Sequence, residues 1–328
     1  MIMVEKFFEK SVEDQKQSLT IFAQDVLKKY GIENAKVECI NYEFNATFAV
    51  TTEAAQRYAL RLNINSTRVE SDILAEVQWV RHLALVQGLN LPSPIATIDD
   101  TYVVSGLHTD SGRQIFGVMY SWIEGEELGD EPTIEQLHTV GASIALMHQN
   151  SLEFVVKDGA ALPMFNDFFW GTEDYLFSNK SKLIPEHREI LRRAHDLIMR
   201  FTQELFTVSP VHIIHGDIHG WNLMWHEGKL TVFDFDDCGI GIEAQDLAVA
   251  LYYLDTPQQN TALLDGYKSI RPLPEYSENA MKSLLLQRRL LLLNYLYETN
   301  NPEHKEMLPA YLEKTLERVS TFLTDVTQ

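Results

Sequence analysis

Residues 215–237, HGDIHGWNLMWHEGKLTVFDFDD, restrict the possible folds more than any other stretch of this chain. A short apolar run at 223–225 is separated from a second run at 230–233 by the segment 227–229, Glu-Gly-Lys. Two short runs of this kind around a glycine predict an antiparallel β-hairpin. The hairpin in turn determines which residues before its first strand come close to residues after its second.

Asp217 and Asn222 precede the first predicted strand, and Asp234 follows the second. The hairpin should therefore bring two carboxylates and one carboxamide oxygen into a small volume. Phosphoryl transfer needs this set, because one Asp deprotonates a hydroxyl while an Asn and another Asp hold Mg²⁺ on the phosphates. The pattern predicts Asp217 as the general base and Asn222 and Asp234 as metal ligands.

The order Asp, four residues, Asn, and a second Asp 17 positions after the first resembles the catalytic and metal loops of protein kinases. HGDxHxxN followed by a hydrophobic-Asp-Phe-Asp run resembles the aminoglycoside phosphotransferase and choline kinase family. This resemblance implies a two-lobed, protein-kinase-like α+β fold and ATP- and Mg²⁺-dependent phosphorylation, mostly of small molecules. The stress-response-kinase and homoserine-kinase-like branches of the family are both open.

Four further polar residues in or near this stretch have candidate roles beside the catalytic residues. His215 is expected to pack beneath the loop, and His219 either reaches a phosphate or packs locally. Asp236 either contacts a second metal ion or bonds the loop backbone. Asp246 resembles the buried Asp with which the family braces its catalytic loop.

The order of predicted elements agrees with two lobes. Strands are expected within 37–51, 57–62, 101–104 and 115–122, and a helix over 70–85. After residue 122 the apolar residues recur mainly at helical spacing. Helices are expected over 134–148, 185–206, 244–254, 279–299 and 305–323. We therefore expect a nucleotide-binding lobe with a small antiparallel sheet over residues 1–122, and a mainly helical catalytic and substrate-binding lobe over residues 123–328.

The chain has neither a Walker loop nor a GxGxxG motif, so phosphates must be held in another way. In the family that the chain resembles, a hairpin of the small lobe covers them, and residues 41–45, Asn-Tyr-Glu-Phe-Asn, occupy that place. The segment has no glycine, so its backbone approaches phosphate less freely. Asn45 matches the Asn that the family often shows at this turn; a plain surface turn is the alternative.

Tyr58-Ala59-Leu60-Arg61 resembles the Val-Ala-Ile-Lys strand of kinases, with Arg61 in place of Lys. An Arg still neutralises phosphates and pairs a carboxylate bidentately, although with different geometry. The expected partner is Glu76 on the following helix, and Glu70 is the rival.

The resemblance also places a hinge at 118–125. Met119 would back the adenine pocket, and backbone groups from Tyr120 to Trp122 would bond the adenine edge. By composition alone this segment is a strand that ends in glycine.

A small hydroxylated acceptor, more cationic than anionic, is expected near an acidic and aromatic set. Its members are Asp167, Phe168, Phe169, Trp170, Glu173 and Asp237. Carboxylates attract an amine, and aromatic faces add cation–π attraction. Amino alcohols, amino sugars and aminoglycosides fit this set, with homoserine or a protein serine as alternatives. In the opposing interpretation, residues 168–170 belong to the core.

Three other functions compete with a small-molecule kinase. Residues 238–243 are too few for a long activation segment, yet the helix with Arg288 and Arg289 resembles that of bacterial stress-response serine/threonine protein kinases. A nucleotide-binding pseudokinase is suggested by Arg61 and the glycine-free loop. A metallohydrolase could use His215, Asp217 and His219, but that leaves Asn222 unexplained.

Composition limits the partners. The net charge of −20 argues against nucleic acid and against an anionic membrane surface. Cys39 and Cys238 show no metal-ligand spacing, which fits a reduced cytoplasmic compartment. Charged residues within the first ten, Glu5, Lys6 and Glu9, do not fit a signal peptide. The pattern does not determine an oligomeric state.

Overall fold

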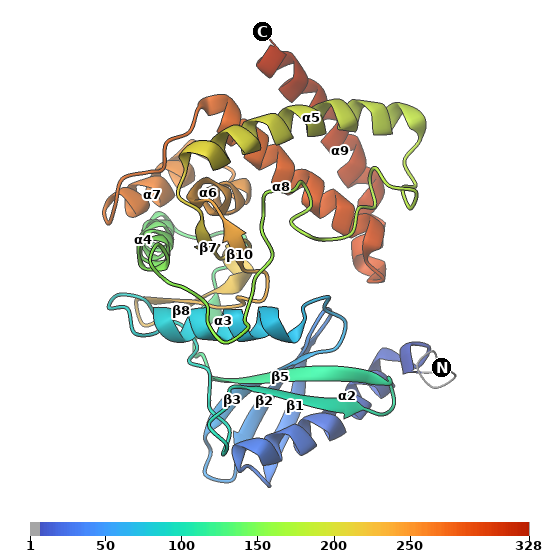
Figure 1. The fold of residues 1–328 in the computed structure, drawn as a ribbon, viewed down its shortest axis with the longest axis vertical. Helices are drawn as coiled ribbons and strands as arrows, with labels where there is room; N and C mark the ends of the chain where they lie inside the picture. Colours follow the sequence, from blue (N-terminus) through green and yellow to red (C-terminus); the bar gives the residue numbers. More distant parts are fainter. Residues whose placement is uncertain (1–6, 328) are drawn as a thin grey trace. The chain divides into compact units, whose positions relative to one another are not determined.

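The computed structural model describes residues 7–327. Glu5 and Lys6, part of the argument against a signal peptide, lie outside the described residues. The chain divides into two compact units (Figure 1). Unit 1 consists of Met1–Glu126, Val155–Ala161 and Met224–Asp236. Unit 2 consists of Glu127–Phe154, Leu162–Leu223 and Asp237–Gln328.

Unit 1 is built on a five-stranded antiparallel sheet of order β1-β2-β3-β5-β4. The strands are β1 (Ala35–Tyr42), β2 (Ala46–Thr52), β3 (Arg57–Asn63), β4 (Val103–His108) and β5 (Arg113–Ser121). Phe48 and Val50 alternate with outward residues, as do Leu60 and Leu62, so one face of the sheet is apolar. Leu19 and Ala23 of α2 (Val12–Leu27) pack on that face. The predicted small antiparallel sheet is therefore present.

A second sheet of order β6-β8-β9 contains the predicted hairpin. Its strands are β6 (Glu126–Glu127), β8 (Leu223–His226) and β9 (Lys229–Val232). Glu227 and Gly228 both have positive φ, 47° and 77°, which is the geometry of a type I′ hairpin turn. Within unit 1, Trp79 of α3 (Glu70–Leu83) meets Phe235 edge to face at 5.5 Å between ring centroids. The residues that follow β9 are thereby anchored on α3.

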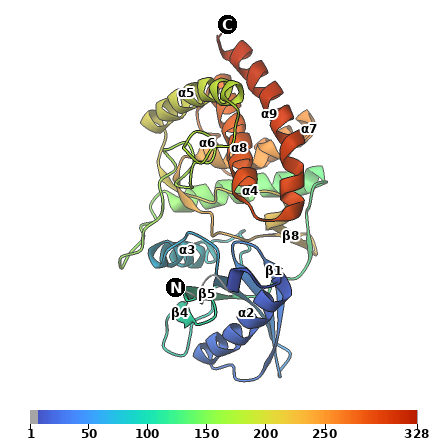
Figure 2. The same ribbon diagram turned by 90° about the vertical axis from the view of Figure 1, so that its right-hand side faces the viewer.

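Unit 2 is mainly helical (Figures 1 and 2). Its helices are α4 (Ile134–Ser151), α5 (Pro185–Val208), α6 (Glu243–Tyr252), α7 (Pro257–Lys268), α8 (Glu278–Glu298) and α9 (Pro302–Thr327). Side chains of α5, α8 and α9, among them Ile198, Leu290 and Val319, form one core. A short antiparallel pair, β7 (His212–Ile214) and β10 (Gly239–Gly241), lies at the start of the catalytic motif.

The sequence pattern did not predict α7. This helix packs so closely on α4 that a Cβ on Gly266 would lie 1.9 Å from the carbonyl oxygen of His138. Gly141 has the same relation to the carbonyl oxygen of Leu263. Gly141 and Gly266 allow this close approach, and Ala262, Leu263 and Tyr267 of α7 are buried.

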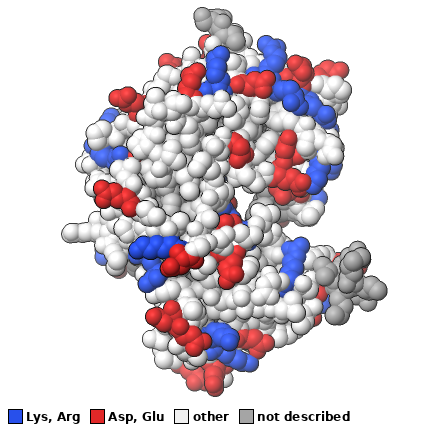
Figure 3. All heavy atoms as spheres, viewed as in Figure 1, with Lys and Arg blue, Asp and Glu red and all other residues white. Residues whose placement is uncertain are grey.

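Among the described residues, no helix is long and apolar enough to cross a membrane. On the face shown in Figure 3, acidic and basic side chains are interspersed over both units.

Candidate functional site

The loop after β7 brings Asp217 and Asn222 together in unit 2. The Nδ2 atom of Asn222 donates to Oδ2 of Asp217 at 3.1 Å and to its backbone oxygen at 2.9 Å. His219 places Nε2 3.3 Å from Oδ2 of Asp217. His219 therefore holds the carboxylate, the local role that the sequence left open beside phosphate binding.

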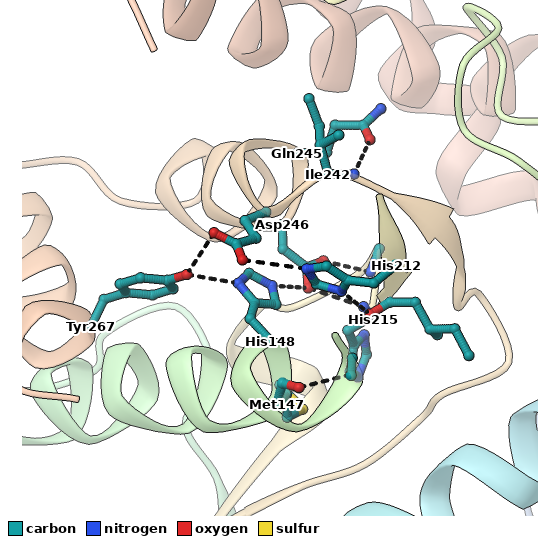
Figure 4. Close-up of polar contacts among 12 residues, drawn as sticks. Met147, His148, His212, His215, Ile242, Gln245, Asp246 and Tyr267 are labelled. Atoms are coloured by element: carbon teal, nitrogen blue, oxygen red, sulfur yellow. Dashed lines mark hydrogen bonds and ion pairs between the residues drawn. The ribbon is translucent and has the colours of Figure 1, made fainter. Parts of the chain in front are cut away.

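Asp246, at the start of α6, braces this loop (Figure 4). Its Oδ2 accepts a hydrogen bond from the backbone N–H of His215 at 3.0 Å, and its Oδ1 accepts one from Gly216 at 2.6 Å. Gly216 has φ 82°, and a Cβ there would lie 2.9 Å from the carbonyl oxygen of Asp237, so glycine is required. His215 is fully buried and its Nδ1 accepts from the N–H of Asp217 at 3.3 Å, which places it beneath the loop.

His148 of α4 supports Asp246 from behind, a role that the sequence did not reveal (Figure 4). Its Nε2 lies 3.0 Å from Oδ2 of Asp246, and its Nδ1 lies 3.0 Å from the hydroxyl of Tyr267. Burial would raise the pKa of Asp246, but its hydrogen bonds and charge interaction with His148 outweigh burial and lower it. The sign of this role in the sequence was a histidine within the apolar face of a predicted helix.

Replacing Asp246 with Asn should lower the free energy of unfolding by about 3 kcal/mol, because the buried partners of the carboxylate lose a charged acceptor. Folding lowers the pKa of Asp246, so its ionised carboxylate stabilises the fold above about pH 4. This stabilisation is lost as the pH falls below the pKa that Asp246 has in the folded protein. Urea unfolding between pH 3 and pH 7 measures both effects. The exposed replacement Asp265→Asn should change stability by less than about 0.5 kcal/mol. Equal unfolding midpoints for the Asp246 variant and wild type would contradict the bracing role.

Arg288 of α8 contacts the proposed base, a contact that the sequence pattern does not predict. Its Nη2 pairs with Oδ1 of Asp217 and donates to the hydroxyl of Tyr253 at 2.7 Å. Burial would raise the pKa of Asp217, but the charge of Arg288 and the bond from His219 hold it well below its usual range. Two consecutive arginines inside an otherwise apolar helix were the signal for such a role.

Unit 1 carries the expected Arg61–Glu76 pair. Nη2 of Arg61 lies 2.5 Å from Oε2 of Glu76, and the two side chains are 10% and 4% exposed. The hydroxyl of Tyr120 donates to the other oxygen of Glu76 at 2.8 Å. Burial would lower the pKa of Arg61, but the negative charge of Glu76 raises it well above its usual value. Glu70, the rival partner, is exposed.

Asn45 and Asp236 meet beside this pair in unit 1. Nδ2 of Asn45 donates to Oδ2 of Asp236 at 2.5 Å, and Oδ1 of Asn45 is buried without a hydrogen-bond partner among the described residues. Burial would raise the pKa of Asp236, but the charge of Arg61 and the hydrogen bond from Asn45 lower it. The observed partner of Asp236 is thus a side chain of the glycine-free loop, and contact with a second metal ion stays a prediction. Asp234 itself is exposed and has φ 61°.

The predicted hinge already uses several backbone groups within unit 1. The carbonyl oxygen of Met119 accepts from Ile95 at 2.7 Å, and its N–H donates to the hydroxyl of Tyr30 at 3.2 Å. The side chain of Met119 is buried, and that of Tyr120 is directed to Glu76. Trp122 lies against Arg57, whose Cζ is 3.7 Å from the ring centroid. The assignment of adenine to a pocket backed by Met119 and to backbone groups from Tyr120 to Trp122 stays a prediction.

Most of the acidic and aromatic residues predicted to line the acceptor site are buried or already have partners within unit 2. Phe168 and Phe169 are buried in the core of unit 2, which is the opposing interpretation of these residues. Asp167 accepts from the N–H groups of Phe169 at 2.9 Å and Gly171 at 3.1 Å, so it stabilises its own loop. Glu173 pairs with Lys180. Phe168, Phe169, Asp167 and Glu173 therefore do not form the expected cation-attracting surface. Asp237 of the same set is exposed.

Known proteins resemble this chain both in sequence and in fold. A family model described as the phosphotransferase enzyme family matches residues 42–278. Amicoumacin kinase of Bacillus subtilis (strain 168) is 24% identical over 276 residues, which cover 78% of this chain and 80% of that protein.

Two solved structures share the fold. The microcompartment-associated aminopropanol kinase has a TM-score of 0.78 and 24% identity, covering 93% of this chain and 98% of that chain. An amicoumacin kinase in complex with AMP-PNP, Ca²⁺ and Ami has a TM-score of 0.74 and 19% identity, covering 94% and 96%. The expected two-lobed, kinase-like α+β fold is confirmed.

Proposed function

The chain belongs to the phosphotransferase enzyme family, and from that premise we propose that Asp217 is the base with which it phosphorylates a small-molecule hydroxyl. The observation that carries this assignment is the contact between Asp217 and Asn222 on a loop fixed by Asp246. Asp217 accepts the hydroxyl proton as the new O–P bond forms. The bond from the γ-phosphorus to its bridging oxygen breaks, and ADP leaves.

The metal assignment follows from the donor set. Because Nδ2 of Asn222 faces Asp217, its Oδ1, the atom that would bind Mg²⁺, faces away from that carboxylate. Asp234 is exposed directly after β9 and supplies a carboxylate oxygen. These are the oxygen ligands that Mg²⁺ prefers, and the order of the motif supports Asn222 and Asp234 as the pair. When bound, the ion neutralises charge on the phosphates.

Arg61 is the proposed phosphate-binding cation in unit 1. Glu76 fixes its guanidinium, and Tyr120 fixes Glu76 in turn, so little rotamer freedom remains to be lost when phosphate binds. Asn45 is the proposed loop contact to phosphate. ATP as the donor is supported by the AMP-PNP bound in the related amicoumacin kinase structure.

Two observations favour a small acceptor over a protein. Only residues 237–242 separate Asp236 from α6, which leaves no long segment to position a peptide. The names of the similar aminopropanol kinase and amicoumacin kinase support a small hydroxyl compound as the acceptor. The name of the aminopropanol kinase supports an amino alcohol. The serine/threonine protein kinase and the pseudokinase are the competing functions.

ATP with Mg²⁺ at about 100 times its Kd should raise the free energy of unfolding by about 2.7 kcal/mol, and ATP with EDTA should raise it less. Acceptor-dependent ADP release, measured by a coupled assay over amino alcohols, amino sugars, aminoglycosides and hydroxy acids, then tests catalysis. Stabilisation without ADP release for any acceptor or for a protein substrate would support the pseudokinase. Release with protein substrates alone would support the protein kinase.

A further inference from the structure

Arg288 has unused hydrogen-bonding capacity beside the proposed base. A guanidinium carries five N–H donors, and the hydrogen bonds of Arg288 within residues 7–327 all come from Nη2. Its Nε is buried and has no hydrogen-bond partner in that part of the chain. The side chain is only 12% exposed, so an unpaired N–H there has a free-energy cost. A ligand group that accepts hydrogen bonds would remove this cost.

Both carboxylate oxygens of Asp217 are occupied in this structure. Oδ2 faces Asn222 and His219, and Oδ1 faces Arg288. A general base must come within hydrogen-bonding reach of the hydroxyl proton, so one oxygen has to become accessible. Asn222 and His219 belong to the same braced loop as Asp217. Arg288 reaches in from α8 on a long side chain and is the partner that can turn away.

Asp237 adds a second negative charge that acts on this pair. Burial would lower the pKa of the Arg288 guanidinium, but the charge of Asp217 and, to a smaller extent, Tyr253 and Asp237 raise it. The site thus offers an arginine and a nearby carboxylate. A planar carboxylate of a ligand matches the guanidinium fork bidentately, and one negative charge disturbs Asp217 less than a phosphate dianion would. An ammonium group of the same ligand would be attracted by Asp237.

We propose that Arg288 determines acceptor specificity by binding a carboxylate of the acceptor, and that this binding draws Arg288 off Asp217 so that Oδ1 faces the reacting hydroxyl. The acceptor class is accordingly a hydroxy amino acid rather than a simple amino alcohol. The inference deepens the proposed function and rests on Asp217 being the base. It favours homoserine-like acceptors, the alternative in the sequence analysis, over amino alcohols, amino sugars and aminoglycosides.

Matched acceptor pairs that differ by one carboxylate test the inference. Homoserine is compared with 3-aminopropanol, and serine with 2-aminoethanol, using wild type, Arg288→Met, Arg288→Lys and the control Lys282→Met. Lys282 is also on α8 but pairs with Glu278 and Asp325, away from Asp217. Wild type and Lys282→Met should show a higher kcat/KM for at least one carboxylate member than for its partner. Arg288→Met should lose about 10- to 100-fold in kcat/KM for that member, the expected effect of losing a charged hydrogen bond. It should keep or raise kcat/KM for the partner without the carboxylate, because methionine does not occupy Oδ1 of Asp217.

Two kinetic results would overturn the inference. One is a higher kcat/KM of wild type for both amino alcohols than for their carboxylate partners. The other is an equal loss of kcat/KM by Arg288→Met for both members of a pair, which would indicate that Arg288 contacts the phosphoryl group. If Arg288→Met does not fold, Arg288→Lys should show a smaller loss confined to the carboxylate member. If no compound is phosphorylated, the change in melting temperature on adding homoserine or serine tests whether these compounds bind. A shift in wild type that is absent in the Arg288 variants would support carboxylate binding by Arg288 while the proposed function, and with it the effect on Asp217, fails. No shift in wild type would overturn the inference.

Discussion

Replacing Asp217 with Asn lowers kcat by about 10²- to 10⁴-fold, the usual contribution of general-base catalysis. The amide has the same shape but cannot take the proton of the acceptor hydroxyl, and Arg288 loses the charge of its partner. ATP affinity should stay nearly unchanged, because the base contacts the acceptor and not the donor. Steady-state kinetics and calorimetric titration of ATP with Mg²⁺ measure the two quantities separately.

The surface variant Asp265→Asn is the control for this experiment. It lies on α7, pairs with Lys268, and should keep both kcat and ATP affinity. If Asp217→Asn loses ATP binding as strongly as it loses turnover, the assignment of Asp217 to the acceptor side is wrong.

Replacing Asp234 with Asn weakens Mg²⁺-dependent ATP binding and lowers kcat at moderate Mg²⁺ concentration by at least about 10²-fold, because a neutral amide replaces a charged metal ligand. Asn is the appropriate substitution, since φ is 61° at this position and Asn tolerates the left-handed region better than Ala does. ATP titrations over a range of Mg²⁺ concentrations measure the effect.

Asp236→Asn is the matched comparison for Asp234. Asp236 accepts from Asn45 and feels the charge of Arg61, so its replacement should affect ATP affinity with little change in Mg²⁺ dependence. Raising Mg²⁺ should partly restore Asp234→Asn but not Asp236→Asn. An unchanged Mg²⁺ dependence in Asp234→Asn would contradict the metal assignment.

The parts of the fold and site that the sequence predicts are local in the chain. The hairpin follows from two apolar runs around Glu227 and Gly228, and both turn residues have positive φ in the structure. The contact between Asp217 and Asn222 follows from a five-residue spacing in one loop. Such features depend on short-range geometry, which a sequence pattern records directly.

Long-range partners are not visible in the same way. Arg288 lies 71 positions from Asp217, and His148 lies 98 positions from Asp246. Each is on a helix whose apolar spacing predicts burial without identifying the partner. The Arg61–Glu76 pair was expected only because a known family arrangement suggested it. Packing decides such contacts, so they require coordinates.

Product analysis tests the central claim most directly. The protein is incubated with ATP, Mg²⁺ and the acceptor panel, and phosphorus NMR with mass spectrometry identifies where the γ-phosphoryl group is. The account predicts a phosphomonoester on the hydroxyl of a small-molecule acceptor with wild type, reduced at least about 10²-fold with Asp217→Asn. Phosphate found only on protein serine or threonine, or only as inorganic phosphate at the same rate with and without acceptors, would contradict it.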